Sequence, residues 1–308
     1  MNSDIYFSVL LPVCHGGSLL QKSLQSLLSM DYAPENYEIL VCFGPGFTDT
    51  APALRQHRTD SDVRVKRVCS PGDSKAAELN TGCAQAQGEI IACADDDCLL
   101  SADWLKNIEK EFQRNPDADV IGGVDDLWGT ERPFDRALDC VLNSPVGTGL
   151  ARGHGRDAFT RSYPKLWNMA FRAETALETA IESRNGTPLV FDEKLPVHED
   201  VDLCRRIEEQ GGTIVVSPRL RVQHRRETHT ASFLARNFRM AQVCRRTGTH
   251  RFAHFGLVAC IAGGLTLLAA GYFVPLLLVA GGVLAGLYAL LLLGGGLWAG
   301  LRQRSLHV

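Results

Sequence analysis

A chain of 308 residues with 22% charged residues and a formal net charge of −3 is long enough for one large domain or two small ones. The near-neutral charge argues against the basic surface of a nucleic-acid-binding protein, so we expect no nucleic-acid partner. The ten cysteines are scattered without a CxxC pair, which argues against a zinc site and a dense disulfide framework and favours a reducing compartment.

The first part of the chain alternates strand and helix patterns. Apolar or alternating runs predict strands at 5–13, 37–43, 63–68, 90–94 and 118–123. Helical spacing and stop signals predict helices at about 20–28, 50–57, 74–86 and 102–113. The N-terminal run has no basic region before it, so it reads as the first strand and not as a signal peptide. This alternation predicts an α/β fold, with a mostly parallel sheet and helices on both faces.

Three adjacent carboxylates, Asp95, Asp96 and Asp97, follow the buried-looking run Ile90–Ala94. Like charges repel, and a carboxylate buried without a partner is costly. The acids therefore form either an ordinary solvated turn or a cation site. Ligands of parallel sheets bind beyond the carboxyl ends of the strands, which favours the second alternative. Two carboxylates one residue apart suit Mg²⁺ or Mn²⁺ shared with phosphate oxygens.

A second acidic pair, Glu199 and Asp200, begins a helix predicted from the apolar spacing of residues 201–207 and ended by Gly211. Acids at a helix N-terminus are favourable in themselves, because they face the positive end of the helix dipole. The alternative is a general base that accepts a proton from an attacking hydroxyl. Before this helix, residues 124–164 lack periodicity and predict a long irregular region. After it, 213–218 and 220–224 predict two short strands.

The C-terminal part has a different composition. No charged residue occurs from Phe255 to Leu301, about twice the ~20 residues that one bilayer crossing needs. Pro275 divides the segment, which predicts a transmembrane hairpin of two helices at 255–274 and 276–301. Basic residues flank both ends and predict that both face the cytoplasm. A buried helical pair or an in-plane segment is the alternative.

Five stretches follow one another in an order that is more specific than any one of them: VLLPVCHGG, EILVCFGPGFTDTA, SKAAELNTGCAQAQGEIIACADDDC, NMAFR and FDEKLPVHEDVDLCRRIEEQGG. In this order the chain resembles family 2 glycosyltransferases of the GT-A fold, over roughly residues 5–240. The stretch RALDCVLNSPVGTGLARG is similar to the branch that makes succinoglycan-type exopolysaccharides. The expected organisation is a Rossmann-like GT-A domain at 1–240, a basic juxtamembrane segment at 241–254 and the hairpin at 255–301.

The resemblance implies an inverting transfer of a sugar from a nucleotide-diphosphate donor to a hydroxyl of a lipid-linked sugar or polysaccharide. The enzyme would be a multi-pass protein of the inner membrane with its catalytic domain in the cytoplasm. The resemblance implies that Asp97 binds the divalent metal, Mg²⁺ or Mn²⁺. It implies that Asp95 binds the ribose of the donor, or the metal through a water molecule. It makes Asp200 the catalytic base, with Glu199 orienting the acceptor or the base.

Further site residues also follow from the resemblance. His224 matches a position that adds a metal ligand in some relatives; the alternative is a surface histidine. Asn80 is expected to be structural. Arg236 and Arg239 face either the diphosphate or anionic lipid. The expected donor-binding set is Pro12, Lys75, Asp95, Asp96, Arg236 and Arg239.

One position departs from the family pattern. Relatives usually carry an aspartate for the nucleotide base after the second strand, where this chain has Phe43. A phenylalanine can stack on a base but cannot accept its N–H, and Asp49 lies six residues further on, so the donor nucleotide stays open. A non-catalytic sugar-binding or scaffold subunit of a membrane polysaccharide-synthesis complex is one alternative. A nucleotidyltransferase is another, although the basic glycine-rich loop of that class is missing.

Overall fold

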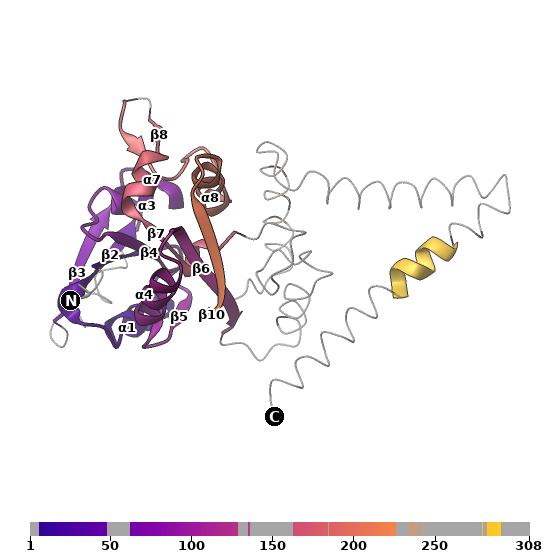
Figure 1. Cartoon of the computed structure of the whole chain (residues 1–308), viewed down its shortest axis with the longest axis horizontal. Coiled ribbons are helices and arrows are strands. Elements are labelled where there is room, and N and C mark those ends of the chain that lie inside the picture. The colour runs from indigo at the N-terminus through magenta and orange to yellow at the C-terminus, as the bar shows by residue number, and fades with distance from the viewer. Residues whose placement is uncertain are drawn as a thin grey trace.

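The computed structural model describes residues 6–47, 62–128, 135, 163–183, 185–225, 235, 238, 242, 279 and 282–290. Most of these residues form one domain, in which a large sheet lies between two layers of helices (Figure 1). The strands of this sheet are β1 (Phe7–Pro12), β2 (Tyr37–Phe43), β3 (Arg64–Cys69), β4 (Ile90–Cys93), β5 (Cys98–Leu100), β6 (Ala118–Leu127), β7 (Met169–Arg172) and β10 (Thr213–His224). The helices are α1 (Gly17–Leu28), α3 (Lys75–Cys83), α4 (Trp104–Arg114), α7 (Ala173–Glu178) and α8 (Glu199–Glu209), with single turns η1 (Pro34–Asn36) and η2 (Leu166–Asn168). A small hairpin pairs β8 (Ile181–Glu182) with β9 (Pro188–Leu189).

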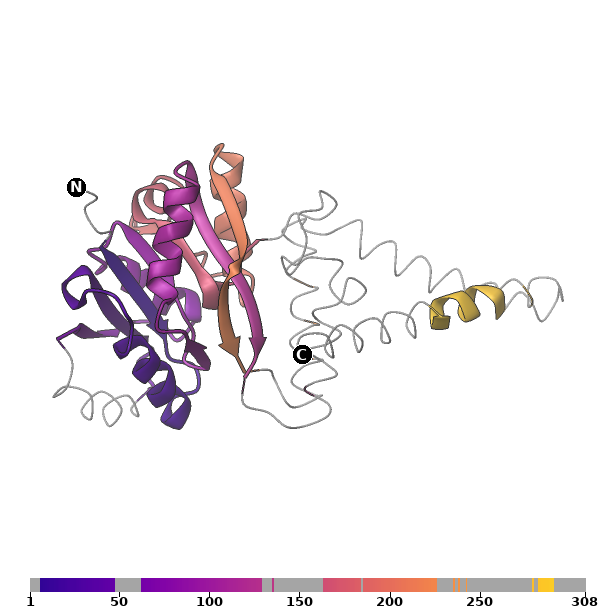
Figure 2. The same ribbon diagram turned by 60° about the horizontal axis from the view of Figure 1, so that its bottom comes forward.

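The order of the eight strands is β3-β2-β1-β4-β7-β6-β10-β5. The first four strands in this order, β3 to β4, are parallel; β7 is antiparallel to both of its neighbours, and β6 and β10 are parallel. These directions bring the carboxyl ends of β1, β2, β4, β6 and β10 to one edge of the sheet. The start of β7 lies at the same edge. Figure 2 shows β6 and β10 side by side along much of their length.

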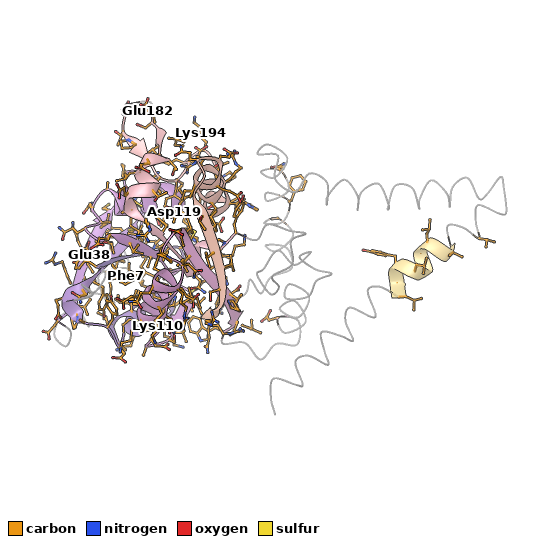
Figure 3. All side chains as sticks on the ribbon, in the orientation of Figure 1. Phe7, Glu38, Lys110, Asp119, Glu182 and Lys194 are labelled. Carbon is orange, nitrogen blue, oxygen red and sulfur yellow. The ribbon has the colours of Figure 1, made fainter. Side chains whose placement is uncertain are left out.

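The strand residues alternate between two hydrophobic cores. Phe7 and Val9 point to the face covered by α1 and α4, whereas Leu10 points to the face covered by α3, α7 and α8. Figure 3 shows Phe7 inside the domain and the charged Glu182 and Lys194 at its outside. The predicted α/β fold, with a mostly parallel sheet and helices on both faces, is therefore confirmed.

The prediction of two short strands at 213–218 and 220–224 was wrong. The structure has one strand, β10, whose register against β6 shifts between Ser217 and Arg221. Pro218 lies within the shift, and proline has no N–H to donate to a ladder, so a strand carries it at a bulge. The break in the sequence pattern is a local irregularity in a continuous strand.

The buried amide of Asn168 joins three elements at the site edge. Trp104 Nε1 donates to Asn168 Oδ1 at 3.0 Å, and Asn168 Nδ2 donates to the carbonyls of Val124 and Leu220 at 3.1 and 3.0 Å. We expect Asn168→Ala to lower the free energy of unfolding by about 3 kcal/mol, because it strands buried donors and acceptors. Urea denaturation measures this; the exposed Asn185→Ala should change stability by less than ~0.5 kcal/mol. Equal midpoints for the two variants would contradict the expectation.

Several predictions fall on residues outside those that the structure describes. These are the helix at 50–57, most of the irregular region, Arg236 and Arg239, and most of the segments 241–254 and 255–301. None of the helices among the described residues combines the length and the apolar composition that a membrane span needs. Residues 282–290 are helical, and their side chains Val283, Leu284, Leu287 and Leu290 are at least half exposed.

Candidate active site

Residues that are far apart in the sequence meet at the carboxyl edge of the sheet. Asp95, Asp96 and Asp97 follow β4 after Ala94 and are 9%, 0% and 8% exposed. They are therefore not a solvated turn. Each carboxylate has its own positive or protonatable partner, which offsets part of the repulsion among the three buried acids.

The partner of Asp95 is Lys75, whose Nζ lies 2.7 Å from its carboxylate. Lys75 begins α3, a helix capped by Ser74, whose Oγ accepts from the Ala77 N–H at 3.1 Å. Burial lowers the pKa of Lys75, but the nearby Asp95, Cys14 and Glu199 outweigh burial and raise it above its ordinary value. Lys75 is therefore a permanent positive charge at this edge. A contact of Lys75 with the nucleotide stays a prediction.

The carboxylate of Asp96 holds the loop between β1 and α1. It accepts from the backbone N–H groups of His15 and Gly16 at 2.6 and 2.7 Å, and pairs with His15 Nδ1 at 3.0 Å. Gly16 has φ +65°, and a Cβ there would lie 2.4 Å from the Phe47 ring, so only glycine fits. Both oxygens of Asp96 are engaged within the protein. The role that the structure shows for Asp96 is therefore to hold the loop between β1 and α1. A donor contact by Asp96, like one by Pro12 at the end of β1, stays a prediction.

The third acid, Asp97, faces a buried histidine. His224 Nε2 lies 3.4 Å from Asp97 Oδ1, and the ring stacks on Trp167 at 4.3 Å with an angle of 5°. His224 is 5% exposed, so the alternative of a surface histidine was wrong. Its other nitrogen, Nδ1, lies 3.7 Å from Asp125. Nδ1 has no hydrogen-bond partner among the described residues, so Asp125 acts on the ring through its charge.

The two residues shift each other's pKa. Burial raises the pKa of Asp97, but His224, His15 and Lys75 outweigh burial and lower it below its ordinary value. Burial lowers the pKa of His224, whereas Asp125 and Asp97 raise it, and the net direction is upward. Asp97 is therefore ionised at neutral pH and faces positive or protonatable groups.

The side chains here fit a divalent cation. Two groups have ligand atoms within 4.8 Å of one another: Asp97, Cys98 and His224, and His15, Asp96 and Asp97. Cys98 offers a soft sulfur ligand, which Mg²⁺ and Mn²⁺ do not prefer, and burial raises the pKa of its thiol well above the ordinary value. Because Asp96 is engaged in the loop, Asp97 and His224 remain as the best pair. A carboxylate with an imidazole suits Mn²⁺ better than Mg²⁺, which prefers oxygen ligands.

Asp200 is held at the first turn of α8. Its Oδ2 accepts from the Leu166 N–H at 3.3 Å and lies 3.9 Å from Lys165 Nζ, and the residue is 7% exposed. The preceding His198 has φ +70°, a left-handed conformation that is uncommon outside glycine. Strained backbone of this kind tends to occur at functional sites.

Glu199 connects this helix to the first acidic group. Burial raises its pKa; Lys75 lowers it, and Asp200 and Asp95 raise it further. The charges of Lys75 and Asp95 therefore act on Glu199, although it lies more than 100 residues later in the chain. The structure brings the two predicted acidic motifs to one place.

Asn80 hydrogen-bonds the helix that carries Lys75 to the segment that leads to Asp200. Its Nδ2 donates to the Phe191 carbonyl at 2.9 Å, and its Oδ1 accepts from the Phe191 N–H at 2.9 Å. The same amide donates to Glu193 at 3.0 Å. Asn80 thus joins α3 to the segment that precedes α8, and its predicted structural role is confirmed.

β2 ends in Phe43, not in an acid, but two carboxylates from a later part of the chain, Asp73 and Glu78, lie beside its end. Phe43 is 7% exposed and packs in the core under α1, with the Arg67 guanidinium 5.0 Å from its ring centre. A Cβ on the next residue, Gly44, would lie 2.8 Å from Asp73 Oδ1 and 3.3 Å from Glu78 Oε1. Glu78 was not among the predicted site residues; its signal in the sequence is an acid among the small and apolar residues of the predicted helix at 74–86.

Glu78 makes stability depend on pH. Burial is the main cause that raises the pKa of Glu78 to about 7, and Asp96 also raises it. Hydrogen bonds from the Gly44 and Val13 backbone and the charge of Lys75 lower the pKa but do not outweigh burial. The unfolded value is about 4.3, so between these pH values the folded protein binds the extra proton, and stability falls as pH rises. We expect Glu78→Gln to be more stable than wild type at pH 8 by on the order of 2 kcal/mol and equal at pH 4. Chemical denaturation at both pH values measures this, and a variant destabilised at pH 8 would refute it.

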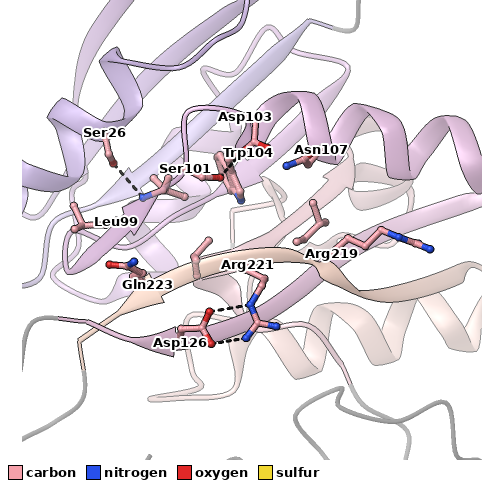
Figure 4. A pocket seen from close by; sticks show the side chains of 13 residues that line it. Ser26, Leu99, Ser101, Asp103, Trp104, Asn107, Asp126, Arg219, Arg221 and Gln223 are labelled. Atoms are coloured by element: carbon pink, nitrogen blue, oxygen red, sulfur yellow. Dashed lines mark hydrogen bonds and ion pairs between the residues drawn. The ribbon is translucent and has the colours of Figure 1, made fainter. Parts of the chain in front are cut away.

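A separate cavity of about 570 Å³ lies beside β5, between α4 and β10 (Figure 4). It contains an ion pair in which Arg221 Nε donates to Asp126 at 2.8 Å. None of the predicted site residues lines it.

The sheet order and the acidic edge define the class: this is a GT-A-like fold. It is similar to the mannosyltransferase PcManGT from Pyrobaculum calidifontis, solved with GDP-Man and Mn²⁺, with a TM-score of 0.67, 20% identity and coverage of 98% of this chain and 85% of that one. It is also similar to S. aureus TarS 1-349 in complex with UDP, with a TM-score of 0.52, 17% identity and coverage of 72% and 61%. The chain belongs to the glycosyltransferase-like family 2, whose profile it matches over residues 6–244.

Curated relatives agree with this family. The glucosyl-dolichyl phosphate glucuronosyltransferase of Haloferax volcanii is 26% identical over 216 residues, or 66% of this chain and 63% of the relative. The glycosyltransferase AglE of the same organism is 30% identical over 124 residues, or 40% of each chain. The chain thus spans less than two thirds of the length of these relatives. The family leaves no place for the nucleotidyltransferase alternative.

Proposed function

We propose that this protein transfers a sugar, with inversion, from a nucleotide-diphosphate donor to a hydroxyl of a membrane-associated acceptor, with the help of a divalent cation. The observation that carries the proposal is the meeting of two acidic groups at one sheet edge. Asp97 lies there beside the buried His224, and Asp200 begins α8 beside Glu199, whose charge environment includes Lys75 and Asp95.

Asp97 and His224 would hold the cation, with Mn²⁺ favoured by the imidazole. When bound, the cation neutralises charge on the diphosphate of the leaving group. Lys75 adds a second positive charge on the donor side. PcManGT with GDP-Man and Mn²⁺, and TarS with UDP, support a nucleotide-sugar donor.

In the proposed reaction Asp200 accepts the proton of the acceptor hydroxyl as its oxygen bonds to the anomeric carbon. The bond from that carbon to the diphosphate oxygen breaks, and the nucleoside diphosphate leaves with the electron pair. Attack from the face opposite the leaving group inverts the configuration. Lys165 Nζ lies 3.9 Å from the Asp200 carboxylate, on the side of the Leu166 N–H that also holds it. Glu199 orients the acceptor.

A lipid-linked sugar or a growing polysaccharide fits best as the acceptor. Support comes from the relative named for a dolichyl phosphate acceptor, and from the uncharged segment 255–301. Apolar side chains exposed on the helix at 282–290 also suit a lipid environment. We propose a multi-pass location in the inner membrane, with the catalytic domain in the cytoplasm and Arg236 and Arg239 near the diphosphate or anionic lipid.

The test is a donor screen with the full chain purified in detergent. UDP-, GDP- and dTDP-sugars are titrated with and without Mn²⁺ in a calorimeter, and transfer to a lipid extract is followed with a radiolabelled sugar. We expect one donor to bind only with Mn²⁺ and its sugar to enter the lipid fraction. A folded protein that binds no donor would overturn the proposal and support the non-catalytic scaffold alternative.

A further inference from the structure

One buried carboxylate at the donor edge has no task in the proposed reaction. Glu78 is 6% exposed, and its Oε2 has no hydrogen-bond partner among the residues that the structure describes. A buried acceptor without a partner costs free energy, so a native protein that keeps one calls for an explanation. A ligand that brings the missing donor is the simplest explanation.

The position of Glu78 relates it to the donor. It lies three residues after Lys75 on α3, hence on the same side of the helix, and Lys75 contacts Asp95 at 2.7 Å. Its Oε1 lies against Gly44, where β2 ends. The free oxygen is thus at the strand ends, on the β2 side of the predicted diphosphate region.

Phe43 leaves this end of the site without an acceptor of its own. Its ring is turned into the core under α1 and covered by Arg67, so it offers no carboxylate and no free face. Gly44 has no side chain, which leaves room for Asp73 and Glu78 to approach. Of these two acids Glu78 is the buried one, and a buried acceptor discriminates between ligands more sharply than a solvated one.

We propose that Glu78 reads the nucleobase of the donor by accepting a ring N–H of uracil, thymine or guanine with Oε2. Adenine and cytosine present a lone pair at the equivalent ring nitrogen, which a carboxylate repels. The donors are therefore UDP-, dTDP- or GDP-sugars and not ADP- or CDP-sugars. The inference rests on the proposed function. The raised pKa of Glu78 agrees with it, because a group kept at a cost in stability usually serves function.

The experiment compares affinities of the full chain in detergent for UDP, GDP, CDP and ADP, each with Mn²⁺. We expect wild type to prefer UDP or GDP over CDP and ADP by at least about 100-fold. Glu78→Gln should reduce that preference at least about tenfold, since its amide can accept from uracil or donate to cytosine. Glu78→Leu should lose UDP and GDP affinity without gaining CDP affinity. Glu111→Gln, which alters a glutamate that is 2% exposed on α4, is the matched control and should keep the wild-type preference.

The outcomes separate the two proposals. A wild type that binds no nucleotide contradicts the proposed function, and the inference with it. A wild type that binds UDP or GDP tightly, with the same preference in Glu78→Gln, overturns the inference alone. Equal binding of CDP or ADP by wild type does so too. Thermal melts of each variant identify any loss that comes from unfolding.

Discussion

Asp200→Asn will abolish sugar transfer while the donor still binds. The asparagine amide keeps the size of the side chain, and its oxygen can still accept from the Leu166 N–H, so α8 stays in place. It cannot take a proton from the acceptor hydroxyl. A positioned general base contributes about 10²- to 10⁴-fold, and we expect the rate of transfer to fall by that factor. Radiolabelled transfer and donor calorimetry on the same preparation measure both quantities.

The control for this experiment is Glu209→Gln, which alters an exposed acid at the other end of α8. It should retain the wild-type rate. If Asp200→Asn kept more than about a tenth of the wild-type rate, Asp200 would not be the base. If the variant lost donor binding as well, Asp200 would belong to the donor site.

The second large effect is expected for Asp97→Asn. This change removes the only carboxylate that belongs to both groups of possible metal ligands in the described structure. We expect Mn²⁺-dependent donor binding to weaken at least about 100-fold, because a neutral amide holds a divalent cation poorly. Electron paramagnetic resonance of free Mn²⁺ measures the metal directly, and calorimetry measures the donor.

The variant His224→Ala tests whether His224 is a metal ligand or only packs beside the site. A true ligand should weaken Mn²⁺ binding about 10- to 100-fold, whereas a residue that only packs on Trp167 should change stability alone. Asp126→Asn is the matched control, since Asp126 also lies at the end of a strand but is half exposed and paired with Arg221. If Asp97→Asn bound Mn²⁺ as tightly as wild type, Asp97 would not be a metal ligand and the proposed metal site would be wrong.

The sequence predicted those features that depend on local pattern. The strand before Asp95 and the helix after Glu199 are continuous apolar or periodic runs, so their boundaries came close to those of β4 and α8. The placement of acids at the carboxyl end of a strand then followed from the rules of parallel sheets. The order of the motifs supplied the family.

Other features depend on contacts between distant residues, which no local pattern contains. Asp96 differs from its neighbours only because His15 and Gly16 donate to it from the first loop. His224 is buried against Trp167, which stacks on its ring from a distant part of the chain. β5, three residues long, is too short to give a period. Pro218 resembled a strand end because a bulge and a break look the same in sequence.

The pairing of β5 with β10 determines when this site can form during synthesis. β5 follows the acids directly, yet it pairs with β10, about 120 residues later in the chain. The same pairing brings His224 to Asp97. Because chains emerge from the ribosome N-terminus first, β1 to β4 and Lys75 can assemble while the partner of Asp97 has not yet been translated. A nascent chain shorter than about 224 residues would thus have Lys75 in place but would lack His224, the proposed partner of Asp97 in holding a cation.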